Sequence, residues 1–470
     1  YADAVNVFTT FKYRTNASHA IMPLGVDLVD KNGNVVASHY HLGFAGGDHY
    51  SNTYNFNVPE SGTYILRFFV CNKSGDHDLA ETHGKITVVG VKEATQEQTD
   101  AFCTELKSVI NNLYTTKYEP RKGETYGYYK TSTVETLGAE LSKEIATAPD
   151  AGAIVDANDA IVFIIPKAGG FYRFSHDFGS TVGRLYVQAE ASNVANKANA
   201  MLMTNDNNGA SSIFYYADNQ MLSYSKALYV KETGNTRGLQ EVASTSDGRK
   251  AKFEQGTAAG QLAIYAGDSF HAHSSGNVYF IDHCGSVHGT EHDFTVEDVT
   301  SLPFTFKKAA LGFATFNAPV AVQLPAGVLA YITEVDETNN VLQMYRLEGN
   351  VVPANTPVML YNEAAKADDA ADETTIDLVI VDAHTGDEFG EIDEKNDFVG
   401  TVAATTYPTT GETVYSLQKK QKVQETDPDM VGFYKKASDT TLGGFKAWIK
   451  INEQGAEGRA FTIIFDGDDA

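Results

Sequence analysis

Short β-type segments recur in the same order three times between residues 165 and 300, at intervals of about 40 residues. Leu185-Tyr186-Val187 in the first copy reappears as Leu228-Tyr229-Val230 in the second. The twelve segments lie at 172–174, 185–187, 201–203, 213–215, 221–223, 228–230, 241–243, 251–253, 262–264, 269–271, 279–281 and 294–296. A repeat this short must bury its apolar face against its copies. Three copies of four strands predict a β-trefoil, whereas a propeller of WD40 blades needs at least four copies.

Residues 1–91, at the start of the chain, alternate strand-like runs with turn signals. Val26–Val29 and 35–37 flank Asn32-Gly33, and Asn-Gly is the strongest short hairpin signal because glycine accepts a positive φ. A second pair of runs, 54–58 and 64–70, is joined by 59–62. The pattern predicts a β-sandwich over 1–91.

Residues 92–160 have a helical period instead. Apolar residues share one helical face at 102, 106, 109, 110 and 113, and again at 134, 137, 141 and 145. A tyrosine-rich loop, 118–130, separates the two faces. We expect a helical hairpin that acts as a spacer.

The remaining residues, 301–470, again read as turn-bounded strands with proline at edges or in loops. They predict a second β-sandwich. The expected chain is therefore mainly β and multidomain: a β-sandwich at 1–91, a helical spacer at 92–160, a trefoil-like domain at 161–300 and a C-terminal β-sandwich at 301–470.

Three of these segments resemble known modules. The run from Val26 to Val70 resembles small β-sandwich modules appended to secreted sialidases and other glycosidases of Bacteroidales-type bacteria. Leu302 to Asp466, with its Gly312-Phe313-Ala314-Thr315-Phe316 and 353–357 motifs, resembles the C-terminal β-sandwich of large secreted proteins of the same bacteria. The middle resembles lectin-like trefoils but lacks their Gln-x-Trp motif. The resemblance implies a secreted or cell-surface protein.

The charge balance narrows the partners. Lys and Arg total 36 against 61 Asp and Glu, so the net charge is −25. A chain this acidic repels phosphate backbones and anionic lipid, which disfavours nucleic acid and membrane surfaces. No run approaches the roughly 20 apolar residues that a membrane helix needs, so we expect no membrane insertion. The 3 cysteines, widely spaced, indicate no disulfide framework.

The third copy of the repeat contains the densest metal-ligand chemistry. Imidazole and thiolate are zinc ligands, and two histidines at i and i+2 share one face of a strand. The candidate ligands are His271, His273, His283, Cys284 and His288. Their spacing matches no catalytic zinc signature, and the alternative is a set of solvated loop histidines. Acidic residues at 466–469 could bind Ca²⁺, which requires six or more oxygens, or could form a solvated tail.

Loop and repeat positions supply the candidate ligand-binding residues. They are Tyr186, Tyr224, Tyr229 and His271 in the repeat, with Asp48 and His49 in the glycine-rich loop of the first sandwich. No nucleophile elbow, P-loop or dinucleotide fingerprint is present in the sequence. We therefore expect a non-catalytic segment that binds glycan or glycoprotein as the accessory portion of a carbohydrate-active enzyme. The alternatives are a structural surface protein with a protein partner, and a hydrolase or metal site on the histidine cluster near Cys284.

Overall fold

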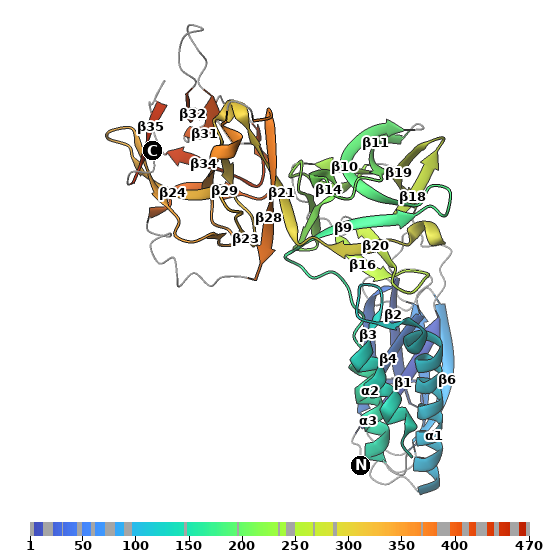
Figure 1. Ribbon diagram of the computed structural model, residues 1–470. Helices are drawn as coiled ribbons and strands as arrows, with labels where there is room; N and C mark the ends of the chain where they lie inside the picture. The colour runs from blue at the N-terminus through green and yellow to red at the C-terminus, as the bar shows by residue number, and fades with distance from the viewer. Residues whose placement is uncertain are drawn as a thin grey trace. The chain divides into compact units, whose positions relative to one another are not determined.

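The computed structural model describes most of the chain, and its architecture is mainly β, in several sheets, as the sequence predicts (Figure 1). The described residues are 4–12, 22–30, 32–44, 49–57, 62–70, 80–88, 96–144, 148–194, 197–233, 236–240, 250–266, 268–284, 289–367, 370–382, 395–406, 413–419, 430–436, 441–451 and 460–466. The chain divides into two compact units. Unit 1 comprises Tyr1–Ile165, Glu254–Ala263 and Cys284–Asp293, and unit 2 comprises Pro166–Phe253, Ile264–His283 and Phe294–Ala470.

Unit 1 begins with two antiparallel sheets. Their strands are β1 (Ala4–Lys12), β2 (Met22–Val29), β3 (Val35–Phe44), β4 (His49–Asn57), β5 (Gly62–Val70) and β6 (Ala80–Val88). One sheet pairs β1 with β4, and the other has the order β3-β2-β5-β6. The predicted hairpin is confirmed: Gly33 has a φ of 87°, and the Asp30 carboxylate accepts the backbone N–H groups of Asn32 and Asn34 at 2.8 Å each. The second predicted pair of strands is present, but β4 and β5 belong to different sheets.

The helical part of unit 1 has one more helix than the sequence predicts. Its helices are α1 (Gln96–Leu113), α2 (Thr131–Ser142) and α3 (Ala148–Asp159), with the short elements η1 (Tyr114–Tyr118), η2 (Glu119–Arg121), β7 (Lys122–Gly123) and β8 (Tyr129–Lys130) between α1 and α2. The predicted apolar faces are buried at Leu106, Ile110 and Leu113 on α1 and at Val134, Leu137 and Leu141 on α2. Two loop tyrosines join this core, because the Tyr118 and Tyr129 rings meet edge to face at 5.0 Å.

A short turn at 256–260 also packs within unit 1. Asp293 accepts the backbone N–H groups of Thr257 at 2.7 Å and Ala258 at 3.2 Å, and Arg121 donates to the carbonyl of Gly256 at 2.9 Å. Asp293 is buried, so these bonds replace the water that its carboxylate loses. Asp293 therefore stabilises this turn.

The middle of the chain contains twelve strands in the predicted order. They are β9 (Gly170–Asp177), β10 (Arg184–Val194), β11 (Lys197–Thr204), β12 (Phe214–Ala217), β13 (Gln220–Ser223), β14 (Tyr229–Thr233), β15 (Thr236–Gln240), β16 (Ala251–Gln255), β17 (Leu262–Ala266), β18 (Asp268–Ser275), β19 (Val278–Cys284) and β20 (Thr295–Asp298). The third strand of the second copy is β15, just before the predicted 241–243, which lie outside the described residues. The strands form one sheet that returns on itself where β11 pairs with β19, giving a nearly closed barrel. The trefoil stays a prediction.

The C-terminal part of unit 2 is built from two larger sheets and a two-stranded ribbon, as expected of a sandwich. Its strands are β21 (Ser301–Lys307), β22 (Phe313–Phe316), β23 (Ala321–Gln323), β24 (Val328–Asp336), β25 (Val341–Arg346), β26 (Val351–Val352), β27 (Val358–Asn362), β28 (Glu373–Val381), β29 (Phe398–Thr401), β30 (Thr405–Thr406), β31 (Thr413–Lys419), β32 (Val431–Lys435), β33 (Thr441–Leu442), β34 (Lys446–Ile451) and β35 (Ala460–Phe465). The sheet orders are β21-β28-β23-β26 and β22-β27-β24-β25-β35-β32-β31-β34-β29, with β30 paired to β33. Strand alternation lets β24 serve two cores: Ala330 and Ile332 pack in one, Tyr331 in the other.

The middle and C-terminal parts of unit 2 share a hydrophobic core across the expected boundary at residue 300. The Phe445 ring lies 4.9 Å from the Tyr224 ring and 5.9 Å from the Phe171 ring. The Tyr224 hydroxyl donates to the carbonyl of Pro303 at 3.1 Å. The backbone N–H of Ala404 donates to Ala227 at 2.8 Å. The two parts are thus continuous in packing as well as in sequence.

Candidate metal centre

The β18–β19 hairpin places two histidines beside an aspartate. Its turn consists of Gly276 and Asn277, and Gly276 has a φ of 61°, as the first central position of a type II′ turn requires. A two-residue turn at this point sets His273 opposite Phe280 and His271 opposite Asp282. The contact between the His273 and Phe280 rings, with centroids 5.3 Å apart, agrees with this register. All four side chains therefore share one face of the hairpin.

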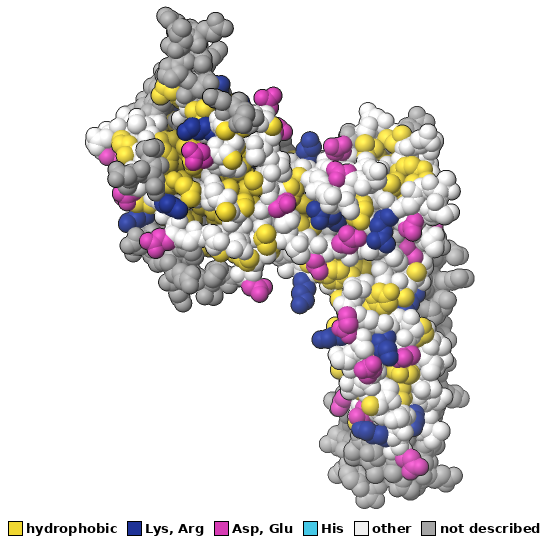
Figure 2. Space-filling model, viewed as in Figure 1, with side chains coloured by type: hydrophobic (Ala, Val, Ile, Leu, Met, Phe, Trp, Pro, Cys, Tyr) yellow, Lys and Arg dark blue, Asp and Glu magenta, His cyan; other side chains and the backbone are white. Residues whose placement is uncertain are grey.

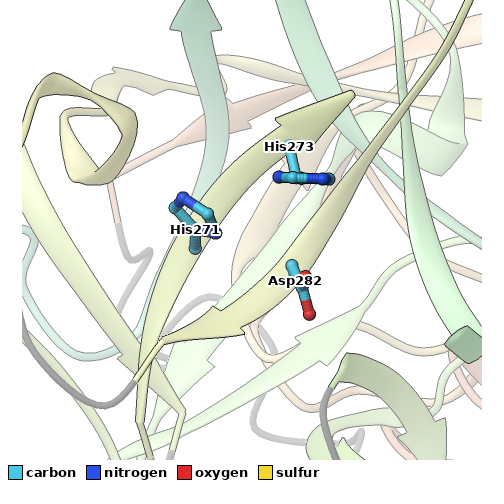
Figure 3. A group of neighbouring side chains, drawn as sticks. All are labelled: His271, His273 and Asp282. Atoms are coloured by element: carbon cyan, nitrogen blue, oxygen red, sulfur yellow. The ribbon is translucent and has the colours of Figure 1, made fainter. Parts of the chain in front are cut away.

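The three polar side chains of this face form a compact group (Figure 3). One donor atom from each of His271, His273 and Asp282 lies within 4.8 Å of the donor atoms of the other two. The two imidazole rings have centroids 5.5 Å apart and are tilted by 43°. Asp282 is buried, His271 is half-buried and His273 is exposed. The group therefore runs from the protein interior to solvent.

The donor set suits a divalent transition metal. Two imidazole nitrogens and one carboxylate oxygen are three of the ligands that Zn²⁺ accepts, at roughly 2.0–2.2 Å. Tetrahedral binding at that length places donor atoms about 3.4 Å from one another, a spacing compatible with atoms that lie within 4.8 Å of one another. The His273 side chain is exposed, so it can adjust to that geometry. Three protein ligands leave one coordination position for water or another donor.

Two of the predicted metal ligands, His271 and His273, belong to this group, and a third member comes from the opposite strand. Asp282 is adjacent to the histidine pair only through the hairpin register, and the signal for it in the sequence is the Ser-Gly-Asn turn midway between residues 271 and 282. His283 and Cys284 lie in β19, but their side chains are outside the described part of the chain. His288 and the acidic tail after Asp466 are also outside the described residues.

Two of the tyrosines that the sequence predicts to bind ligand are buried in the protein interior. Tyr186 is buried, and its hydroxyl donates to Glu297 at 3.3 Å. Tyr224 lies in the shared core described above, where burial raises the pKa of its phenol. Tyr229 is half-buried on β14, and burial raises its pKa as well. The buried rings of Tyr186 and Tyr224 offer little surface to a sugar, and the role of all three tyrosines in glycan binding stays a prediction.

The structure does not describe the side chains of the two ligand-binding residues that are predicted in the first sandwich. Asp48 lies outside the described residues. His49 begins β4, where only its backbone is described. Trp448 in the C-terminal part is a core residue with 3% of its surface exposed, packed with Val414 and Leu442.

Charged side chains are mixed over the surface. Figure 2 shows acidic and basic groups interspersed on the face drawn, despite the net charge of −25. Among the helices of the described residues, none combines the length and apolarity required to cross a bilayer.

Comparison with known proteins identifies no family. No family model matches the chain, and no curated protein matches its sequence significantly. The crystal structure of Cry35Ab1 matches at a TM-score of 0.22 and 8% sequence identity, over 46% of this chain and 79% of that chain. A similarity this low supports no conclusion about fold or function.

Proposed function

We propose that this chain is a non-catalytic binding protein whose middle domain holds a divalent transition metal ion, best fitted by zinc, at His271, His273 and Asp282. The observation that carries the proposal is the convergence of three ligand atoms within 4.8 Å on one hairpin face. Two of these ligands come from one strand and one from its neighbour, so the pairing of β18 with β19 assembles the site. The site is local, and no other part of the chain is needed to form it.

The chemistry of the donors favours zinc over calcium. Calcium takes six to eight oxygen ligands, and this group offers one carboxylate and two imidazoles. Imidazole suits zinc, copper, iron and nickel, and among these zinc combines best with a mixed nitrogen and oxygen set at low coordination number.

The open coordination position indicates what such a metal would do. His273 is exposed, so the metal would be reachable from solvent and could accept an oxygen donor from a ligand. We propose that this ligand belongs to the class expected from the sequence, a glycan or glycoprotein. The proposal keeps the chain as the accessory portion of a larger secreted protein. A hydrolase would need, in addition, a general base within hydrogen-bond reach of the metal-bound water.

Zinc titration of the intact chain tests the metal site. We expect isothermal titration calorimetry to detect zinc binding that Asp282→Asn and His273→Gln each weaken by at least about 10-fold, because even changes in the outer shell of metal sites cost 10- to 100-fold. The matched control is Asp218→Asn, an exposed acid in the β12–β13 turn at a φ of 51°, which asparagine tolerates. Circular dichroism checks that each variant folds.

Two results would contradict the proposal. Failure of the wild-type chain to bind zinc would remove the site. Equal zinc binding by the wild type and by Asp282→Asn would place any bound zinc elsewhere in the chain. Once zinc binding is established, a glycan array probed with and without a chelator separates metal-dependent recognition from a metal with a structural role only.

A further inference from the structure

Several lysines line a hollow in the C-terminal part of unit 2. Its cavity is about 430 Å³, and it is lined by residues of β21, β22, β31, β32, β33, β34 and the short helix η6 (Lys308–Ala310). Four lysines line it, Lys307, Lys419, Lys436 and Lys446, and the lining that the structure describes includes no aspartate or glutamate. Acids outnumber bases 61 to 36 in the whole chain, so an acid-free wall with four lysines is a marked local reversal of charge.

Strand alternation builds this hollow. Lys446 and Trp448 lie two residues apart on β34 and therefore face the same side of the sheet. Trp448 is almost fully buried and gives that side a rigid apolar base, and Phe313 and Leu417 add further apolar surface to the lining. Ser416 and Gln418 on β31 supply neutral hydrogen-bonding groups. The lining thus combines positive charge, aromatic surface and polar groups, as small-molecule sites do.

The Lys446 side chain is exposed, yet neighbouring protein around its ammonium lowers its pKa by burial, with repulsion from Lys307 as a smaller cause. The ammonium lies 5.1 Å from the centroid of the Phe304 ring. Lys307 forms an ion pair with Glu373 at 3.5 Å, but both side chains are well exposed, so the pair is weak.

Lys307 repels Lys446 across this lysine-lined hollow, and a bound anion would relieve that repulsion. We infer that this cavity is a binding site for a small organic anion, with the lysines around the anionic group and Phe313 and Leu417 beside its carbon skeleton. The volume is in the range of about 300–1,000 Å³ that small-molecule sites occupy. Inorganic phosphate would satisfy the charge but leave the apolar wall without a partner. This inference does not depend on the metal site.

The test compares matched ligands on the intact chain, which is first freed of metal with a chelator and then dialysed to remove the chelator, so that neither a metal site nor a competing anion contributes. The probes are glucuronate, glucose and inorganic phosphate, titrated by saturation-transfer NMR or calorimetry. We expect glucuronate to bind, glucose to bind at least about 10-fold more weakly, and phosphate to bind more weakly than glucuronate, since a charge-assisted hydrogen bond is roughly twice as strong as a neutral one. Raising the salt concentration should weaken glucuronate binding.

Variants locate the site. Lys446→Met keeps the apolar stem and removes the charge, and we expect it to weaken glucuronate binding about 10-fold or more. Lys446→Arg should restore most of the affinity. Lys366→Met is the matched control, because Lys366 is exposed in the same part of the chain and does not line the cavity. Equal binding of glucuronate and glucose, no binding of glucuronate, or unchanged binding by Lys446→Met would each overturn the inference.

Discussion

Replacement of Phe445 by alanine tests whether the middle and C-terminal parts of unit 2 fold as one body. Phe445 is 4% exposed and contacts two rings of the middle part, Tyr224 at 4.9 Å and Phe171 at 5.9 Å between centroids. Deletion of its ring opens a cavity between these partners. The backbone conformation at residue 445, with a φ of 53°, is equally strained for phenylalanine and alanine, so the ring alone changes.

The expected loss is large. Phe→Ala substitutions in cores cost about 3–5 kcal/mol, which includes the transfer of the ring and the cavity that remains. Within a shared core, this loss lowers the opening free energy on both sides of the junction. A decrease of about 3 kcal/mol accelerates amide exchange by roughly 100-fold, since 1.4 kcal/mol is a factor of ten.

Hydrogen exchange with mass spectrometry measures the effect peptide by peptide. We expect Phe445→Ala to accelerate exchange in β12 and β13 of the middle part as well as in β22 and β24 of the C-terminal part. The control is Phe433→Ala, because Phe433 is also fully buried but belongs to the second C-terminal core. Its effect should stay within the C-terminal part. Acceleration by Phe445→Ala that is confined to residues after 300 would refute the shared core.

Three further predictions follow from single residues. Phe445→Gly should be about 1 kcal/mol more stable to urea than Phe445→Ala, because glycine accepts the positive φ at this position; equal stability would contradict this reasoning. Asp293→Ala removes a buried acceptor of two backbone N–H groups and should destabilise unit 1 by about 2–3 kcal/mol, with faster amide exchange at 256–260; unchanged exchange there would show that the carboxylate is dispensable. Glucuronate affinity should begin to fall at a pH below the usual pKa of lysine, because burial lowers the pKa of Lys446 and a deprotonated amine no longer attracts the anion; in Lys446→Arg this early fall should be absent, and a similar fall there would assign the titration to another group.

Local periodicity predicted most elements of this chain. The helical faces at 102–113 and 134–141 and the strands of the threefold repeat all depend on spacings of 3.6 or 2 residues, which the backbone itself imposes. Helix α3 was missed because Ala148–Asp159 has few large apolar residues and only a weak amphipathic pattern. Its partners are α1 and α2, and their packing supports a helix that its own sequence barely indicates.

The candidate metal site shows the limit of prediction from local sequence patterns. His271 and His273 were predictable as a pair because alternation places them on one face of a strand. Asp282 joins them only through the hairpin register, so the five ligands predicted from the sequence do not include it. Tyr186 and Tyr224 are the opposite case: the sequence predicts them as ligand contacts, and the structure buries them. A tyrosine on a strand can face solvent or the core, and the sequence alone does not say which.

The sequence by itself determined the mainly β, multidomain class, the order of the strands in the repeat and the apolar faces of α1 and α2. The tertiary structure decided which strands pair, that Phe445 and Tyr224 meet across residue 300, and that lysines from β21, β31, the end of β32 and β34 face one cavity. The physical reason is the sequence separation over which each kind of interaction acts. Backbone geometry repeats within a few residues, whereas pairing and core sharing depend on the summed packing energy of residues more than a hundred positions apart.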